Sequence, residues 1–222
     1  VSRIPTPVRY RVEGPVADTF ETVEPGGHIA DWNIYSPLWA PVRVVESSEA
    51  GRKCLELRDR DPYDYARAVR VFQEGTTVRV NVGVCPRQTR DGLLNIEVMD
   101  RYGNRPVRLM FDNDGRIKAY DGAALVDLQP YAPDTWYSLE FVIDARPFGS
   151  YSVAIDGRNV LKEAALAEAV LSVERLSFRT GPHRHLPTRQ TDNERPHEPL
   201  SGADEPVPEA VFYIAPVQVT GS

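Results

Sequence analysis

The sequence predicts an all-β fold, a sandwich of two antiparallel sheets. Apolar and polar residues alternate with a period of two through about a dozen segments, as half-buried strands require. The dipeptide Asp-Gly, which favours tight hairpin turns, occurs four times between such segments. A chain of 222 residues can form one large β domain and bury roughly 70% of its unfolded surface without a disulfide framework. Residues 1–222 are therefore expected to form a single domain.

The expected strands follow one another along the whole chain. Each has an apolar set on alternate positions, which would face the core, and polar residues between them. In order they are 8–12, 42–46, 53–57, 66–72, 77–84, 93–99, 107–111, 116–120, 136–144, 150–156, 173–179 and 210–219. Seven residues of the pair 136–144 and 150–156 are expected at or near the core: Trp136, Leu139, Phe141, Ile143, Tyr151, Val153 and Ile155.

Turn signals separate these strands. Glycine supplies the positive φ that a tight hairpin needs, so each Asp-Gly marks a reversal of the chain. The four are Asp91-Gly92, Asp114-Gly115, Asp121-Gly122 and Asp156-Gly157.

Two segments depart from the alternation. Residues 161–170, LKEAALAEAV, contain strong helix formers and predict at most one short helix. Residues 182–208 contain six prolines and few large apolar side chains, which excludes a central strand or a helix. A loop of this length is usually functional or disordered. We expect an extended surface strap that either walls one end of a ligand groove or docks against a neighbouring domain; the alternative is disorder.

Composition and charge exclude several classes of partner. The net charge of -6 argues against nucleic acid, which is bound through a basic surface. No apolar run approaches the roughly 18 residues of a transmembrane helix, so no membrane contact is expected. The two cysteines, Cys54 and Cys85, could form one bridge only if their strands are neighbours.

Strand parity selects a candidate ligand-binding face. With Val80, Ile96 and Leu109 directed inward, the polar residues between the apolar positions face outward. If their strands share one sheet, its floor offers guanidinium, amide and carboxylate groups suited to sugar hydroxyls or a uronate. The alternative is ordinary cross-strand pairing on a solvated sheet. The candidate ligand-binding residues are Arg70, Arg79, Asn81, Asn95, Glu97 and Arg108.

No pattern identifies a catalytic centre. Glu97 and Asp100 are three apart on a strand and so point to opposite faces, unlike the carboxylate pair of a glycosidase. His183, His185 and His197 could bind a transition metal, but a proline-rich loop that merely contains histidines explains them better. No catalytic residue or cofactor is assigned.

The runs GLLNIEVMDRYGNRPVRLMFDNDGRIKAYDG (92–122) and TWYSLEFVIDARPFGSYSVAIDGRNV (135–160) resemble the middle of concanavalin A-like, laminin G-like jelly rolls of carbohydrate-active proteins. Residues 18–34 and 211–219 resemble the first and last strands of such domains. The resemblance implies a jelly roll that is secreted, periplasmic or at the cell surface.

The resemblance implies a non-catalytic carbohydrate-binding or accessory domain whose partner is an oligo- or polysaccharide. The alternative is a polysaccharide lyase or glycoside hydrolase that acts on an acidic glycan. Many relatives hold a structural calcium ion between their terminal strands, and Asp18 and Glu21 match one half of that site. Tyr213–Pro216 supply no carboxylate for the other half. Asp59, Asp61 and Asp64 form a second acidic group, better explained as an Asx turn.

Overall fold

A computed structural model describes residues 12–47, 51–181 and 205–221. Within these ranges the chain forms strands and connecting turns, and no described residue lies in a helix. None of the described segments could therefore cross a membrane as a helix. Residues 8–11 of the predicted strand at 8–12 and residues 182–204 of the proline-rich segment lie outside the described residues, and Val12 belongs to no strand.

The strands follow in the order β1 (Val16–Asp18), β2 (Trp32–Tyr35), β3 (Val42–Ser47), β4 (Arg52–Asp59), β5 (Arg67–Gly75), β6 (Thr77–Pro86), β7 (Leu94–Met99), β8 (Val107–Phe111), β9 (Arg116–Asp121), β10 (Ala124–Pro130), β11 (Tyr137–Asp144), β12 (Ser150–Ile155), β13 (Arg158–Ala165), β14 (Val173–Thr180) and β15 (Ala210–Gly221).

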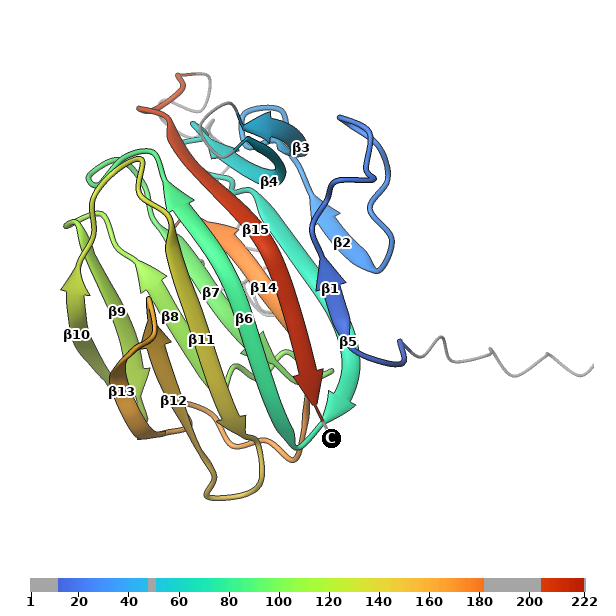
Figure 1. Ribbon diagram of the computed structural model, residues 1–222. Coiled ribbons are helices and arrows are strands. Elements are labelled where there is room, and N and C mark those ends of the chain that lie inside the picture. Colours follow the sequence, from blue (N-terminus) through green and yellow to red (C-terminus); the bar gives the residue numbers. More distant parts are fainter. Residues whose placement is uncertain (1–11, 48–50, 182–204, 222) are drawn as a thin grey trace, which may run out of the picture.

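Two antiparallel sheets pack face to face, as predicted (Figure 1). The eight-stranded sheet has the order β13-β12-β11-β6-β15-β4-β3, and β1 also pairs with β15. The seven-stranded sheet has the order β10-β9-β8-β7-β14-β5-β2. Strands that follow each other in the sequence, such as β5 and β6, thus lie in different sheets. The candidate ligand residues are therefore divided between the two sheets.

The core lies between the sheets and is filled by the apolar sets of the alternating strands. The predicted core side chains of the β11–β12 hairpin are buried: the exposed fraction is at most 1% for Leu139, Phe141, Ile143, Tyr151, Val153 and Ile155. Trp136 is partly buried and packs against this core, with Arg52 Cζ 4.5 Å from the centre of its ring. The predicted core positions of this hairpin are therefore confirmed.

The Asp-Gly dipeptides lie between strands, as predicted. Three of them close hairpins, whereas Asp91-Gly92 lies in the longer connection from β6 of one sheet to β7 of the other. All four glycines have a positive φ, from 56° at Gly122 to 79° at Gly115. At the β12–β13 turn Asp156 also has a positive φ of 51°, the combination that a type I′ turn requires.

The helix predicted at 161–170 is wrong. Arg158–Ala165 form β13, which pairs with β12 at the edge of the eight-stranded sheet. The register with β12 shifts twice along this strand, and Glu163 has a φ of 49°. Pairing with β12 and burial of Ala164 against the core outweigh the helix propensity of single residues.

Cys54 and Cys85 are both buried and both free thiols. Cys54 belongs to β4 and Cys85 to β6, and β15 lies between these two strands. Two strand spacings amount to roughly 9.5 Å, which exceeds the span that a disulfide can bridge. Burial raises the pKa of both thiols, that of Cys54 to about 12 and that of Cys85 to about 11.

Candidate functional site

The outer face of the seven-stranded sheet carries a concentration of arginines. Register fixes which side chains share this face, because partners in adjacent strands point the same way. Arg179 on β14 lies between Arg67 on β5 and Asn95 on β7. In the next row Ser177 lies between Val69 and Glu97.

Three predicted ligand residues share this face: Asn95, Glu97 and Arg108. Glu97 is 3% exposed and lies opposite Arg108 of β8. Its Oε1 accepts a hydrogen bond from Arg105 Nη1 at 3.3 Å and lies 3.7 Å from Arg108 Nε. Asn95 Nδ2 donates to the carbonyl of Gly181 at 3.2 Å. Arg108 Cζ lies 4.1 Å from the ring centre of Tyr120, so this guanidinium is held by a carboxylate and an aromatic face.

Arg79 and Asn81 do not belong to this group. They lie on β6, in the eight-stranded sheet, where Arg79 forms an exposed ion pair with Glu140. Asn81 lies opposite Glu140 and Gln218 on the outer side of that sheet. Their outward direction was predicted correctly, but the prediction of one shared floor is wrong, because alternation does not reveal strand order.

Arg70 points the other way from the predicted face. It lies opposite Trp32 and Leu176, which are core residues, and it is 7% exposed. Its Nε donates to Asp18 Oδ2 at 2.6 Å, and its Nη1 lies 3.5 Å from Asp31 Oδ2. Phe72, on the same face of β5, is buried in the core. The prediction that Arg70 faces outward as a ligand residue is therefore corrected: it forms a structural ion pair.

The row of Arg67, Arg179 and Asn95 places two positive charges directly opposite each other. Like charges at cross-strand positions destabilise a sheet unless something neutralises them. Burial lowers the pKa of Arg179; the charges of Glu97 and Tyr65 raise it, and the nearby positive charges of Arg105 and Arg67 lower it further. Arg179 Cζ also lies 5.4 Å from the ring centre of Tyr65. Arg67 and Arg179 thus bring two guanidinium groups together at this part of the face.

A depression of about 210 Å³ opens beside this row and is called here the arginine depression. It is lined by Asn33, Ile34, Tyr35, Arg67, Val69 and Arg175. No carboxylate belongs to this lining, and no ion pair joins Arg67 to another described residue. Arg175 Nε approaches Glu174 only to 3.8 Å. Tyr35 adds an aromatic ring that is 47% exposed.

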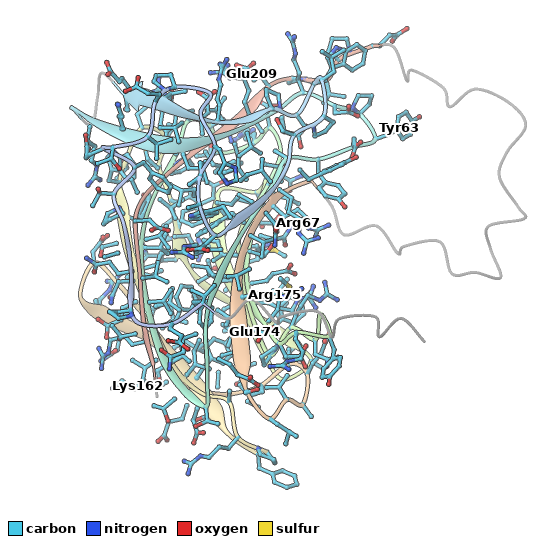
Figure 2. All side chains as sticks on the ribbon, turned by 90° about the vertical axis from the view of Figure 1, so that its right-hand side faces the viewer. Tyr63, Arg67, Lys162, Glu174, Arg175 and Glu209 are labelled. Carbon is cyan, nitrogen blue, oxygen red and sulfur yellow. The ribbon has the colours of Figure 1, made fainter. Side chains whose placement is uncertain are left out.

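The seven-stranded sheet carries this site along one side of the sandwich. Figure 2 shows Arg67, Arg175 and Glu174 one below another beside the sheet, away from Lys162 on β13 of the other sheet. Buried polar atoms without a hydrogen-bond partner among the described residues include Arg67 Nε, Arg175 Nε and Ser177 Oγ. Such groups are rare in folded proteins and require an explanation at each position.

A larger depression of about 940 Å³ shares Arg175 with the arginine depression and is called here the acidic depression. Its lining includes three carboxylates, Glu13, Glu74 and Glu174, against two arginines, Arg101 and Arg175. Arg101 pairs with Glu74 and, at 3.3 Å, with Glu174. Tyr102, also in the lining, is 85% exposed. The two adjoining depressions thus differ in the sign of their charge.

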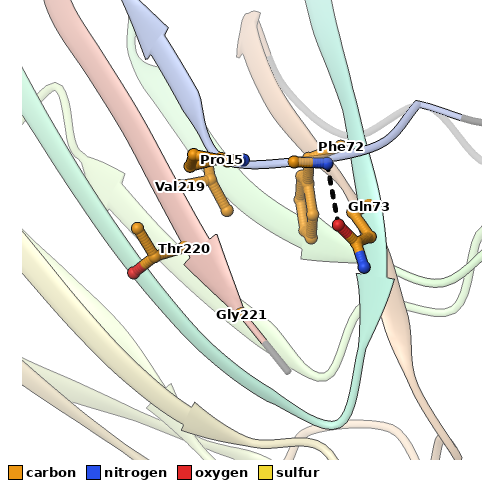
Figure 3. A pocket seen from close by; sticks show the side chains of 7 residues that line it. Pro15, Phe72, Gln73, Val219, Thr220 and Gly221 are labelled. Carbon is orange, nitrogen blue, oxygen red and sulfur yellow. Dashed lines mark hydrogen bonds between the residues drawn. The ribbon is translucent and has the colours of Figure 1, made fainter.

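A third depression, of about 120 Å³, lies at the edge of the sandwich, where β15 and the residues before β1 in one sheet meet β5 of the other (Figure 3). The backbone nitrogen of Gly14 donates to Gln73 Oε1 at 2.8 Å. Its lining, which includes Phe72, Val219 and Thr220, has no ionisable side chain. The Gly14–Gln73 hydrogen bond joins the two sheets. The lining has no charged group that could bind an ionic ligand.

Two acidic residues singled out in the sequence, Asp100 and Asp61, stabilise turns. The sequence excluded Asp100 as the partner of Glu97 in a glycosidase carboxylate pair. Its carboxylate accepts hydrogen bonds from the backbone nitrogens of Tyr102 and Asn104 and so stabilises the β7–β8 turn. Asp61 Oδ1 accepts from the nitrogens of Tyr63 and Asp64, which is the predicted Asx-type turn.

Metal-ligating side chains do not cluster in the described ranges. Across residues 12–47, 51–181 and 205–221, no three His, Cys, Asp or Glu side chains come together as a metal site. The carboxylate of Asp18, which the resemblance placed in one half of a calcium site, accepts hydrogen bonds from Arg70 Nε and Trp32 Nε1. His183, His185 and His197 lie outside the described residues.

Arg67 and Arg175 were missed by the parity argument, although the sequence contains their signal. In ARAVRVF the two arginines are three positions apart and so face opposite sides of the strand. Choosing Arg70 as the outward residue selected the wrong side. In VERLSFR, inward Leu176 and Phe178 place Arg175, Ser177 and Arg179 outward by the same rule.

Comparison with solved structures identifies related folds. A sialidase shares 29% identity with a TM-score of 0.86; the match covers 99% of this chain and 20% of the sialidase. An endo-β-1,4-glucuronan lyase from the fungus Trichoderma reesei has 14% identity and a TM-score of 0.57, with coverage of 88% and 93%. The alginate lyase Aly36B has 11% identity and a TM-score of 0.56, with coverage of 94% and 97%. The fold is thus the expected concanavalin A-like jelly roll.

Sequence comparison gives the family. No curated protein sequence matches the chain. The family model described as "Sialidase-like, CBM domain", for carbohydrate-binding module, matches residues 32–195, most of the chain. The chain therefore belongs to the sialidase-like CBM domain family.

Proposed function

We propose that the protein is a non-catalytic carbohydrate-binding domain that binds its glycan on the outer face of the seven-stranded sheet. The arginine depression supports this most strongly, because it places two guanidinium groups, an amide and an exposed tyrosine around one hollow without a lining carboxylate. Arginine forks and aromatic rings suit sugar recognition, since guanidinium groups bind oxygens bidentately and aromatic rings provide rigid apolar contact area.

The domain would serve as an accessory unit of a larger secreted carbohydrate-active protein. The similar sialidase supports this arrangement, because the match covers only 20% of that chain. The segment 182–208 would dock against the neighbouring domain. Limited proteolysis tests the docking: cleavage at Arg189 and Arg195 should be rapid in the isolated domain and suppressed in the longer protein. Equally rapid cleavage in both contradicts the docking.

A binding titration combined with a product assay tests the proposed function. Isothermal titration against acidic and neutral oligosaccharides should give saturable binding. The same mixtures should accumulate neither new reducing ends nor unsaturated products absorbing in the ultraviolet. Product formation would instead support the alternative, a polysaccharide lyase or glycoside hydrolase, while failure of every oligosaccharide to bind would contradict glycan recognition itself.

A further inference from the structure

We infer that the arginine depression binds the carboxylate of an acidic sugar, and that the adjoining acidic depression takes neutral sugars linked to it. This inference rests on the proposed function and names the class of glycan. It follows from three features of the outer face of the seven-stranded sheet: an excess of positive charge at one end, carboxylates at the other, and a residue shared by both.

The first feature is the excess charge around Arg67. Arg67 and Arg179 are register partners on β5 and β14, and like charges in this arrangement repel each other. Glu97, a buried carboxylate of the same face, is already engaged by Arg105 and Arg108. Since Arg67 has no ion-pair partner among the described residues, a ligand carboxylate at the arginine depression would neutralise its charge.

The second feature is the geometry of the donors. Arg67 and Arg175 line the same hollow from neighbouring strands, with the exposed ring of Tyr35 and the amide of Asn33 beside them. A planar carboxylate accepts two parallel hydrogen bonds from a guanidinium group, which a neutral hydroxyl cannot do. The hollow therefore discriminates by charge as well as by shape.

The third feature is the acidic depression, which limits the ligand to few carboxylates. Its three carboxylates outnumber its two arginines. Since Arg101 already pairs with Glu74 and Glu174, Glu13 is the carboxylate left to repel a second acidic sugar placed there. The exposed ring of Tyr102 offers an apolar surface to a neutral sugar instead. An acidic sugar joined to neutral ones matches both ends of the face, whereas a polyuronate matches only one.

Calorimetric titration with five oligosaccharides tests the inference. Two probes carry one carboxylate: 3′-sialyllactose, and aldotetraouronic acid, which is xylotriose bearing one glucuronate. Lactose and xylotriose are their neutral counterparts, and a glucuronan tetrasaccharide carries a carboxylate on every unit. At least one single-carboxylate probe should bind about tenfold or more tightly than its neutral counterpart, which corresponds to one charged hydrogen bond or more. The difference should shrink as salt rises.

The variants Arg67→Gln and Arg175→Gln should each reduce this preference about tenfold and leave the unfolding temperature within a few degrees. The matched control is Arg146→Gln, which removes an exposed arginine on the hairpin between β11 and β12. Equal binding of acidic and neutral counterparts, or a preference that survives Arg67→Gln, overturns the inference but leaves glycan binding in place.

The polyuronate separates the two halves of the inference. Tighter binding of the glucuronan tetrasaccharide than of either single-carboxylate probe contradicts the assignment of neutral sugars to the acidic depression. If none of the five probes binds, the inference and the proposed function both fail.

Discussion

Arg70 Nε donates a hydrogen bond to Asp18 Oδ2 at 2.6 Å, and this ion pair joins the two sheets of the sandwich. Arg70 belongs to β5 of one sheet and Asp18 to β1 of the other. Trp32 Nε1 donates to the same carboxylate oxygen at 2.8 Å. The side chain of Arg70 is only 8% exposed, so Asp18, together with Asp31, stabilises its charge in place of water.

Replacing Arg70 by Met should therefore destabilise the protein. The carboxylate of Asp18 would lose its charged partner at a largely buried position, where removal of one member costs about 3 kcal/mol or more. Chemical denaturation measures the loss. The control Arg146→Met breaks an exposed pair with Asp144 and should cost far less, because water screens exposed ion pairs. Equal losses for the two variants would contradict a structural role for Arg70.

Phe141→Ala should cost about 3 to 5 kcal/mol of unfolding free energy, because the fully buried ring leaves a cavity in a close-packed core. Val142 is the adjacent residue of β11, points outward and is 38% exposed, so Val142→Ala is a matched control with a small expected effect. A loss below 1 kcal/mol for Phe141→Ala would refute the packing of the two sheets around this ring.

Glu56 should make stability fall in acid. Burial by itself would raise the pKa of this carboxyl, but hydrogen bonds from Arg58 and Arg43 outweigh burial and lower it below 4.5. A carboxyl with a depressed folded-state pKa stabilises the fold above its unfolded pKa, and that contribution is lost as pH falls through the folded value.

Unfolding free energies measured at several pH values between about 3 and 7 test this dependence. The wild type should lose more stability below about pH 4.5 than Glu56→Gln, which has no carboxyl to protonate. Parallel curves for the two proteins would show that the ion pairs of Glu56 with Arg43 and Arg58 contribute nothing.

Arg108→Ala tests how far the binding surface extends beyond the arginine depression. Arg108 does not line that depression, and its guanidinium group lies beside Glu97 and Tyr120. Calorimetric titration should therefore give an affinity for the acidic oligosaccharide close to that of the wild type. A loss of about tenfold or more with an unchanged melting temperature would place Arg108 in the binding site and contradict this prediction.

Sequence alternation predicts the direction of a side chain but not its sheet. Val80 and Ile96 point inward as expected, and their outward neighbours Asn81 and Glu97 were also placed correctly. The two lie on opposite outer surfaces of the sandwich, because strand order depends on long-range pairing that no local pattern encodes.

Two local errors have other physical causes. Arg70 faces inward because Asp18 and Asp31 offer it carboxylates. A rule that places apolar residues inside and charged residues outside cannot predict this ion pair. Residues 161–165 pair with β12 as a strand, since tertiary contacts override helix propensity. The Asp-Gly turns were predictable because the required positive φ is a property of the glycine itself.

The most direct test of glycan binding on the seven-stranded sheet is a crystal structure of the protein with the oligosaccharide that binds most tightly. We expect the sugar over β5 and β14, with its carboxylate within hydrogen-bonding distance of Arg67 or Arg175. A sugar bound to the eight-stranded sheet, or to the turns at either end of the sandwich, would contradict this account.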